Sequence, residues 1–194
     1  MKYKNFSLIG RSGCGKGTQA KLLMEKISNL YHVSTGDLFR KLVDTGSATA
    51  KKIAEVVDSG GLPFDDIATT LWMYEIAHNV KEGQGFVLDG APRRLVEAQN
   101  LDRFMDFLEQ KYETAMLLLD ISRAEAFRRL MERGEREKRD DDNAKAINNR
   151  LDYYEERVVE VIDYYEKQER LIRINGEQPI ERVHEEIMVK IQGE

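Results

Sequence analysis

Residues 10–19 read Gly10-Arg11-Ser12-Gly13-Cys14-Gly15-Lys16-Gly17-Thr18-Gln19, directly after an apolar stretch at 6–9. The spacing of Gly10, Gly15 and Lys16 is that of a phosphate-binding loop, in which glycines let successive backbone N–H groups converge on one anion. The helix that follows adds its positive N-terminal end, and Lys16 adds a full charge beside the outer phosphates. A glycine-rich turn without a ligand is the alternative. A strand before the loop and a helix after it favour binding of a nucleoside triphosphate.

The composition is that of one soluble domain. The chain has 194 residues, of which 41% are hydrophobic and 34% charged, and its net charge of −5 does not suggest a general affinity for nucleic acid. No apolar run approaches the roughly eighteen residues of a membrane span. The strand and loop begin so early that no signal peptide is expected. The single cysteine, Cys14, offers neither an internal disulfide nor a zinc cluster. We therefore expect a cytoplasmic protein without structural zinc and without nucleic-acid or membrane partners.

Short apolar runs alternate with long helical patterns along the chain. The apolar runs lie at 3–9, 31–33, 86–90, 115–121 and 171–174. They lack polar alternation, which indicates parallel strands buried on both faces. Helical patterns occupy about 37–44, 48–58, 66–81, 94–111, 123–133, 142–168 and 179–191. This order predicts an α/β fold with a doubly wound parallel sheet of the P-loop NTPase type, in which ligands bind at the carboxyl ends of the strands.

Two segments do not fit the sheet. Residues 35–65 hold short helical patterns separated by Gly46 and by Gly60-Gly61, which indicates a small helical insertion. Residues 133–143 are almost entirely charged and cannot contribute to a core. Taken alone, such a run is more often a solvated loop between two helices.

Carboxylate and guanidinium groups gather near the expected binding edge. Asp89 ends an apolar strand, and beside a phosphate loop such a residue favours a site for the magnesium of a nucleotide. Arg93 follows it by four residues and therefore lies at the same edge. Arg129 and Arg133 are spaced to share one helix face. Guanidinium groups suit the charge that develops during phosphoryl transfer, although surface pairing with nearby glutamates is the alternative. The three histidines are scattered and are expected to be surface or packing residues.

Together these motifs resemble the adenylate kinase family of nucleoside monophosphate kinases. The resemblance covers nearly the whole chain and rests on residues 10–19, Ser34-Thr35-Gly36-Asp37-Leu38-Phe39-Arg40, Asp89-Gly90-Ala91-Pro92-Arg93, Arg133 and Asp141-Asp142-Asn143. It implies one kinase unit with its core at 1–34, 66–132 and 144–194, a monophosphate-binding insertion at 35–65 and a short lid at 133–143. The charged run then becomes a mobile cover instead of a solvated loop.

The resemblance also implies roles for individual residues. Those expected at the triphosphate are Gly13, Cys14, Gly15, Lys16, Gly17, Thr18, Arg129, Arg133 and Gln178. Those expected at the monophosphate are Thr35, Arg40, Gly61, Leu62, Pro63, Gly90, Arg93, Glu97, Arg139 and Arg150. The expected catalytic residues are Lys16, Arg93, Arg133, Arg139 and Arg150. Magnesium would be held mainly by phosphates and water, with Asp89 and Thr18 nearby.

Three positions depart from the family pattern. Ala91 stands where phenylalanine is usual, and Ser12 alters the usual Gly-x-Pro-Gly opening of the loop. Glu97 stands where adenylate kinases commonly carry glutamine. An ionised carboxylate only accepts hydrogen bonds, whereas an amide can donate to adenine N1 while accepting from the adenine amino group. The identity of the acceptor base is therefore open, and Glu97→Gln is expected to favour AMP over CMP or GMP.

Three hypotheses about function follow. The leading one is reversible transfer between ATP and AMP, giving two ADP, by in-line attack on the γ-phosphorus with magnesium present. Glu97 motivates the second, a UMP/CMP or broad-specificity monophosphate kinase. The third, from another class, is a non-catalytic nucleotide-operated switch. Arg93, Arg133, Arg139 and Arg150 argue against it, as does the absence of an Asn-Lys-x-Asp segment. The sequence gives no indication about self-association.

Overall fold

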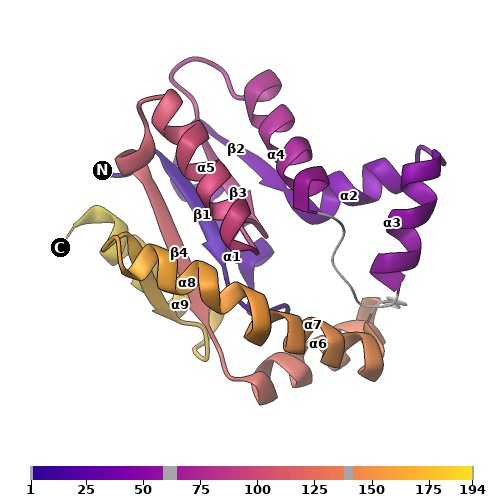
Figure 1. The fold of residues 1–194 in the computed structure, drawn as a ribbon. Coiled ribbons are helices and arrows are strands. Elements are labelled where there is room, and N and C mark those ends of the chain that lie inside the picture. Colours follow the sequence, from indigo (N-terminus) through magenta and orange to yellow (C-terminus); the bar gives the residue numbers. More distant parts are fainter. Residues whose placement is uncertain (1, 59–64, 138–141, 194) are drawn as a thin grey trace.

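One parallel sheet organises the molecule (Figure 1). The computed structural model describes residues 2–58, 65–137 and 142–193. Within them, five strands pair in the order β2-β3-β1-β4-β5. Their bounds are β1 Asn5–Ile9, β2 Leu30–Ser34, β3 Gly85–Asp89, β4 Thr114–Asp120 and β5 Leu171–Asn175. The predicted doubly wound α/β fold is confirmed, with each strand close to its expected position.

Helices connect the strands and cover both faces of the sheet. Their bounds are α1 Lys16–Lys26, α2 Thr35–Val43, α3 Ala48–Asp58, α4 Asp65–Asn79, α5 Leu95–Phe107, α6 Arg123–Glu137, α7 Ala144–Tyr153, α8 Val159–Glu166 and α9 Ile180–Gln192. A short 3₁₀ turn, Lys111–Glu113, precedes β4. The single helix expected at 142–168 is interrupted by a π-helical turn, Tyr154–Val158, between α7 and α8. Such turns often occur at functional sites. None of the described helices is both long and apolar enough to cross a membrane.

Two hydrophobic cores lie on opposite faces of the sheet. Leu8 of β1 belongs to the core shared with Leu23 of α1 and Ile187 of α9. Its neighbour Ile9 faces the other core, which includes Trp72 of α4. This alternation explains the continuous apolar runs of the sequence, because both sides of each central strand are buried.

Two helices, α2 and α3, lie in the described part of the segment 35–65, for which a helical insertion is expected. Helices α2 and α3 project to one side of the sheet (Figure 1). Helix α2 begins directly after β2, and its N-terminus is capped by the Ser34 hydroxyl, which accepts a hydrogen bond from the Asp37 N–H at 3.3 Å. The insertion therefore starts at the carboxyl edge of the sheet, where the phosphate loop also lies.

The charged segment at 133–143 differs in part from its prediction as a loop. Helix α6 continues to Glu137, so the first residues of the segment are helical. Glutamate and arginine are good helix formers, and pairs one turn apart, such as Arg128 with Glu125 at 2.7 Å, add support along the same helix. A charged composition argues against a role in the hydrophobic core, but it excludes neither a helix nor the burial of a paired charge such as Asp142. Residues 138–141 lie outside the described part of the chain.

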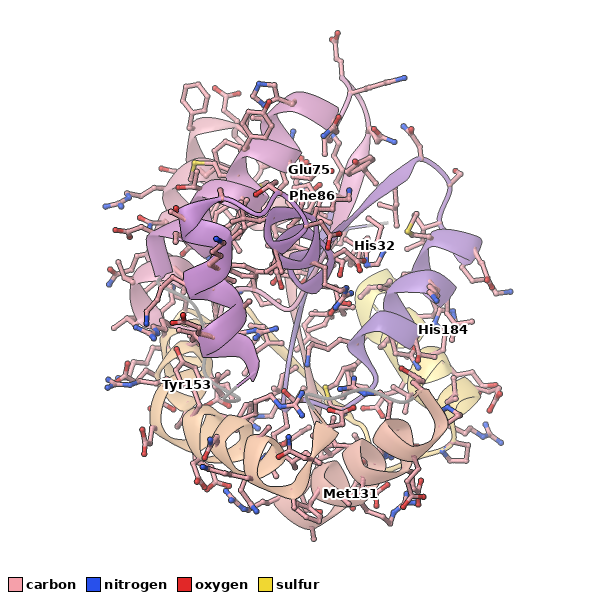
Figure 2. The ribbon with its side chains drawn as sticks, turned by 90° about the vertical axis from the view of Figure 1, so that its right-hand side faces the viewer. His32, Glu75, Phe86, Met131, Tyr153 and His184 are labelled. Atoms are coloured by element: carbon pink, nitrogen blue, oxygen red, sulfur yellow. The ribbon has the colours of Figure 1, made fainter. Side chains whose placement is uncertain are left out.

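His184 is buried where α9 packs against α1, the helix that follows the phosphate loop (Figure 2). Its side chain is a packing residue, as expected, and neither ring nitrogen has a hydrogen-bond partner among the described residues. Burial lowers the pKa of His184 below its ordinary value of 6.5, and the charge of Lys26 lowers it further. Glu25 and Glu185 oppose that shift. The imidazole is therefore held in its neutral form in the folded protein.

We expect His184 to make the stability of the fold depend on pH. A group whose folded pKa is depressed binds more protons when unfolded, so its contribution is present above pH 6.5 and is lost as the pH falls through the folded pKa. Urea unfolding at about pH 7.5 and about pH 5.5 should show this decrease, and His184→Leu should reduce it. The matched control is His78→Leu, since His78 is exposed. An equal pH dependence in the His184 variant and the wild type would contradict the assignment.

Candidate active site

The phosphate loop has the backbone conformation that its glycines predict. Gly10, Gly13 and Gly15 have φ angles of 146°, 84° and 100°, a region that other residues rarely adopt. Helix α1 begins directly afterwards, at Lys16. The Lys16 ammonium group folds back over the loop and donates to the carbonyls of Gly10 at 2.9 Å and Arg11 at 3.0 Å. The loop and its lysine thus surround the position at the N-terminus of α1 where an anion is stabilised.

Asp89 lies against the start of α1. A Cβ atom added at Gly17 would be 3.3 Å from its Oδ2 atom, so glycine at this position lets the carboxylate approach the helix closely. Thr18, the next residue of α1, is exposed in the first turn. His32 lies in no motif that indicates a role in the site, yet its Nε2 atom is 3.9 Å from Asp89 Oδ2. In the pairing of β2 with β3, His32 lies opposite Val87 and Ser34 lies opposite Asp89, so His32 and Asp89 are diagonal neighbours on the two strands. Knowledge of this strand pairing would have indicated their proximity.

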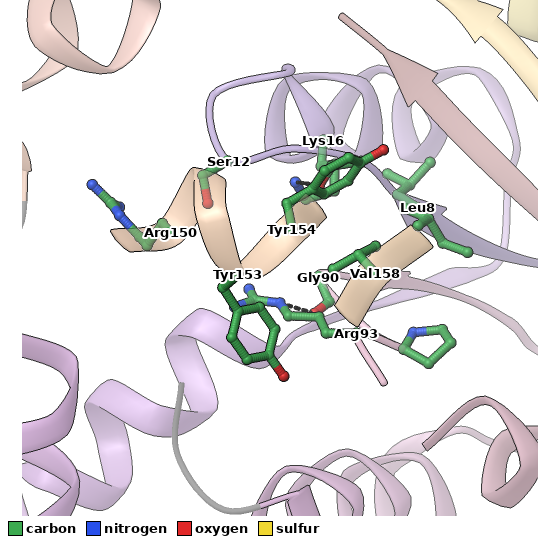
Figure 3. Close-up of a pocket in the computed structure, with 12 residues that line it drawn as sticks. Leu8, Ser12, Lys16, Gly90, Arg93, Arg150, Tyr153, Tyr154 and Val158 are labelled. Carbon is green, nitrogen blue, oxygen red and sulfur yellow. Dashed lines mark hydrogen bonds between the residues drawn. The ribbon is translucent and has the colours of Figure 1, made fainter. Parts of the chain in front are cut away.

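A pocket joins the phosphate loop, the turn after β3 and the α7–π segment (Figure 3). Four predicted site residues line it together: Lys16, Gly90, Arg93 and Arg150. The Arg93 side chain is oriented by a hydrogen bond from its Nε atom to the Gly90 carbonyl at 2.6 Å. Two or more cationic side chains around one pocket at a helix N-terminus form a site for a highly charged anion.

The pocket also contains residues that the sequence analysis missed. Ser12, Tyr153 and Tyr154 line it beside the predicted set. Tyr154 follows Arg150 by one helical turn, so helical spacing could have indicated that it faces the same region. Burial raises the pKa of the Tyr154 phenol to about 12, and the charge of Arg11 opposes that shift. Tyr154 is therefore a neutral wall of the pocket at ordinary pH.

Asp142 brings two of the predicted arginines together. Its carboxylate, whose side chain is fully buried, accepts from Arg133 Nε at 2.6 Å and from Arg133 Nη2 at 2.9 Å. It also accepts from Arg150 Nη2 at 2.6 Å. Burial acts to raise the pKa of Asp142, but the hydrogen bonds from both arginines outweigh it, so the pKa lies below its ordinary value. The ionised carboxylate holds the two guanidinium groups side by side. Arg139 lies outside the described residues.

Arg129 contacts the loop before α9. Arg129 Nη2 donates to the Gly176 carbonyl at 3.0 Å, and its Nε atom donates to Glu125 at 2.6 Å. Hydrogen bonds from Arg128 and Arg129 lower the pKa of Glu125 to about 2. The side chain of Gln178, in the same loop, donates to the Asn175 carbonyl at 3.0 Å. The residues expected at the triphosphate base thus lie side by side.

On the opposite side, the predicted monophosphate residues are only partly brought together. The Thr35 hydroxyl donates to the Asp89 carbonyl at 3.0 Å and lies next to Gly90. Arg40 is exposed, forms an ion pair with Asp37 and is not among the described residues that line the pocket. Gly61, Leu62 and Pro63 lie outside the described part of the chain.

Glu97 is buried in the first turn of α5, with only 4% of the residue exposed. Its Oε2 atom accepts a hydrogen bond from the backbone N–H of Arg93 at 2.6 Å. Its Oε1 atom accepts from the indole N–H of Trp72 at 3.0 Å. Trp72 could not be identified from sequence, because nothing in the pattern of α4 indicates which side chain reaches α5.

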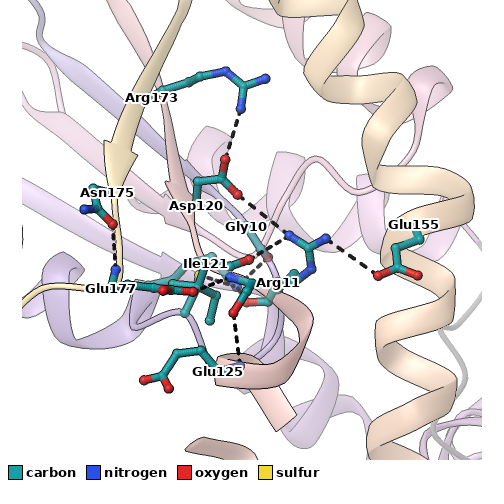
Figure 4. A network of polar contacts seen from close by, with 12 residues as sticks. Gly10, Arg11, Asp120, Ile121, Glu125, Glu155, Arg173, Asn175 and Glu177 are labelled. Atoms are coloured by element: carbon teal, nitrogen blue, oxygen red, sulfur yellow. Dashed lines mark hydrogen bonds and ion pairs between the residues drawn. The ribbon is translucent and has the colours of Figure 1, made fainter. Parts of the chain in front are cut away.

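Arg11, near the start of the phosphate loop, connects three parts of the site (Figure 4). Its guanidinium group donates to the Ile121 carbonyl at 2.8 Å and lies 3.7 Å from Asp120 and 3.6 Å from Glu155. It also lies over the Tyr154 ring, 4.3 Å from the ring centroid. Arg11 therefore ties the loop to the end of β4 and to the π-helical turn.

The comparisons with known proteins agree with this geometry. A family model described as adenylate kinase matches residues 8–170. The chain is 37% identical over 186 residues to an adenylate kinase of Thermobifida fusca, covering 96% of this chain and 97% of the relative. It is 35% identical over 190 residues to an adenylate kinase of Azobacteroides pseudotrichonymphae, covering 97% of each. An adenylate kinase of Methanocella arvoryzae is 34% identical, with 96% of this chain and 98% of the relative covered.

Proposed function

The chain belongs to the adenylate kinase family, and from that membership we propose that it transfers the γ-phosphoryl group of ATP reversibly to AMP, giving two ADP. The family identifies it as an ATP-dependent nucleoside monophosphate phosphotransferase. The observation that carries the proposal is the convergence of Lys16, Arg93 and Arg150 on one pocket at the phosphate loop. A pocket of this kind suits two phosphate groups facing each other.

Each side of the pocket has a proposed task. The loop amides and Lys16 would hold the triphosphate, and Arg93 would hold the phosphate of the acceptor. An oxygen of the acceptor then attacks the γ-phosphorus in line, and ADP leaves from the opposite side. The protein forms no covalent bond to the substrates in this step, because positioning and charge stabilisation account for most of the catalysis of such a transfer.

Arg133 and Arg150 are proposed to stabilise the transferred group. In the structure their guanidinium groups already converge on the Asp142 carboxylate, which presents two oxygens in nearly the way a phosphoryl group would. Asp142 therefore keeps the two cations close together against their mutual repulsion before nucleotide binds. The charged lid, including Arg139, is proposed to cover the site and exclude water, which limits hydrolysis of ATP.

Magnesium is proposed to enter with the nucleotide. Within the described residues no group of three potential ligand side chains gathers, which suits an ion held mainly by phosphates and water. The Asp89 carboxylate, close to Gly17 at the start of α1, and the neighbouring Thr18 hydroxyl supply oxygen atoms of the kind that magnesium prefers. When bound, the ion would neutralise charge on the β- and γ-phosphates.

AMP is the proposed acceptor, and a UMP/CMP or broad-specificity kinase is the alternative. That alternative was motivated by Glu97, but both carboxylate oxygens of Glu97 already accept hydrogen bonds from Arg93 and Trp72. This engagement weakens the case for Glu97 as a reader of the base. The names of the relatives also support AMP. A cytoplasmic location stays a prediction.

The test is a matrix of triphosphate donors against monophosphate acceptors, in which the formation of diphosphates is measured for each pair. ATP with AMP should give the highest kcat/KM. A clear preference for CMP or UMP would overturn the choice of acceptor while leaving the kinase chemistry intact. If no donor–acceptor pair gave any diphosphate, both the choice of acceptor and the kinase chemistry would be overturned.

A further inference from the structure

A buried hydrogen-bonded pair connects α4 to α5 beside the pocket. Trp72 is fully buried on α4, and its ring centroid is 6.2 Å from the ring centroid of Phe104. Its indole N–H donates to Glu97 Oε1 at 3.0 Å. An indole nitrogen can only donate, so this contact requires an acceptor at position 97.

The other oxygen of the same carboxylate reaches back toward the pocket. Glu97 Oε2 accepts from the backbone N–H of Arg93 at 2.6 Å. Glu97 is the third residue of α5, after the N-cap Arg94, so it resembles the glutamate of a capping box. In a capping box the glutamate accepts from the N–H of the N-cap residue, whereas Glu97 accepts from the N–H of Arg93, the residue just before the N-cap. Arg93 is the residue whose side chain lines the pocket and donates to the Gly90 carbonyl.

This arrangement gives a physical reason for a carboxylate at position 97. Two of its partners, the Trp72 indole and the Arg93 amide, are both donors. A carboxylate meets them with two acceptor oxygens, and the N-terminus of α5 favours its negative charge. A glutamine has one acceptor oxygen, so its NH₂ group would face one of the two N–H groups. A buried donor would then lose its partner.

We propose that Trp72 and Glu97 form a positioning bridge that holds the Arg93 loop in place for the acceptor phosphate. The proposal rests on the proposed function in one respect, namely that Arg93 binds the acceptor. In this bridge, Trp72 is a positioning residue that acts through Glu97. Glu97 then sets the rate with every acceptor instead of choosing among their bases.

The test is a double-mutant cycle of wild type, Glu97→Gln, Trp72→Phe and the double variant, assayed with AMP, CMP, GMP and UMP. In the wild-type background Glu97→Gln should lower kcat about ten-fold with every acceptor used, because one donor is left unpaired at a residue that positions Arg93. In the Trp72→Phe background the same change should cost less than about three-fold, since the glutamine oxygen can then serve Arg93 alone.

A second variant removes the donor without changing the shape of the ring. Trp72 is the only tryptophan of the chain, so replacing tryptophan with β-(3-benzothienyl)alanine during expression changes this position alone. This analogue has sulfur in place of the indole N–H, and it should protect against Glu97→Gln as Trp72→Phe does. It keeps the experiment decisive if the phenylalanine variant does not fold. Glu181→Gln is the matched control, because Glu181 is an exposed glutamate in the first turn of α9.

Two outcomes overturn the bridge. One is an equal cost of Glu97→Gln with and without the indole N–H. The other is a changed AMP-to-CMP ratio, which is the base-reading result expected from sequence. Thermal unfolding of the same proteins separates failure of the bridge from failure of the proposed function. If the wild type transfers phosphate to no acceptor, the bridge still predicts that Glu97→Gln lowers the Tm more in the wild-type background than without the N–H donor.

Discussion

Alanine in place of Arg93 is expected to lower kcat with ATP and AMP by about a thousand-fold, with little change in the unfolding free energy. Arg93 lines the pocket together with Lys16 and Arg150, and its side chain is pre-oriented by the Gly90 carbonyl. In the proposed function, its removal would take one fixed positive charge away from the phosphate groups during transfer. A coupled assay of ADP formation measures the loss, and thermal unfolding checks the fold.

Two further variants make that result specific to the site. Arg93→Lys keeps the charge but loses the planar pair of donors, so its rate should fall between wild type and alanine. Arg103→Ala removes an exposed arginine from the nearby helix α5 and should leave kcat unchanged. A wild-type rate in Arg93→Ala would mean that the arginines around the pocket are surface charges without a catalytic role.

Methionine in place of Lys16 is expected to lower kcat by about a hundred- to a thousand-fold and to weaken ATP binding. Without nucleotide, the ammonium group binds the carbonyls of Gly10 and Arg11 and lies 3.5 Å from the Cys14 sulfur. This places the charge directly over the loop whose amides are proposed to hold the triphosphate. Methionine keeps most of the length of the side chain and removes only the cation.

Calorimetric titration with ATP and the same ADP assay together measure both effects. Lys21→Met is the matched control, since Lys21 is exposed on α1 beyond the loop. If Lys16→Met bound ATP as tightly as the wild type and turned over at the same rate, the phosphate loop would not be the donor site.

The backbone of the site could be predicted from sequence because its signals are local. The glycines of the phosphate loop specify positive φ angles, and buried parallel strands read as continuous apolar runs. Once a strand, a loop and a helix are placed, Lys16 and Arg93 must lie at the carboxyl edge of the sheet. The fold and the central cations therefore followed from short stretches of chain.

The contacts that orient those cations could not be predicted, because they join distant segments through side chains. Arg11 meets Ile121, and Trp72 meets Glu97, by packing of separate elements. Asp142 belongs to the Asp141-Asp142-Asn143 motif, but the motif does not indicate its role, which is visible only when α6 and α7 bring Arg133 and Arg150 onto it. The helical start of the charged segment was also missed, because charge patterning reports solvation more than conformation.

This pocket is proposed to transfer phosphate between two nucleotides. Phosphorus NMR of the protein with ATP, AMP and magnesium tests it directly, because the technique follows each nucleotide and inorganic phosphate separately. We expect ATP and AMP to disappear in equal amounts, ADP to form in twice that amount, and no inorganic phosphate to accompany the exchange. Release of inorganic phosphate with AMP unchanged, or no reaction at all, would contradict it.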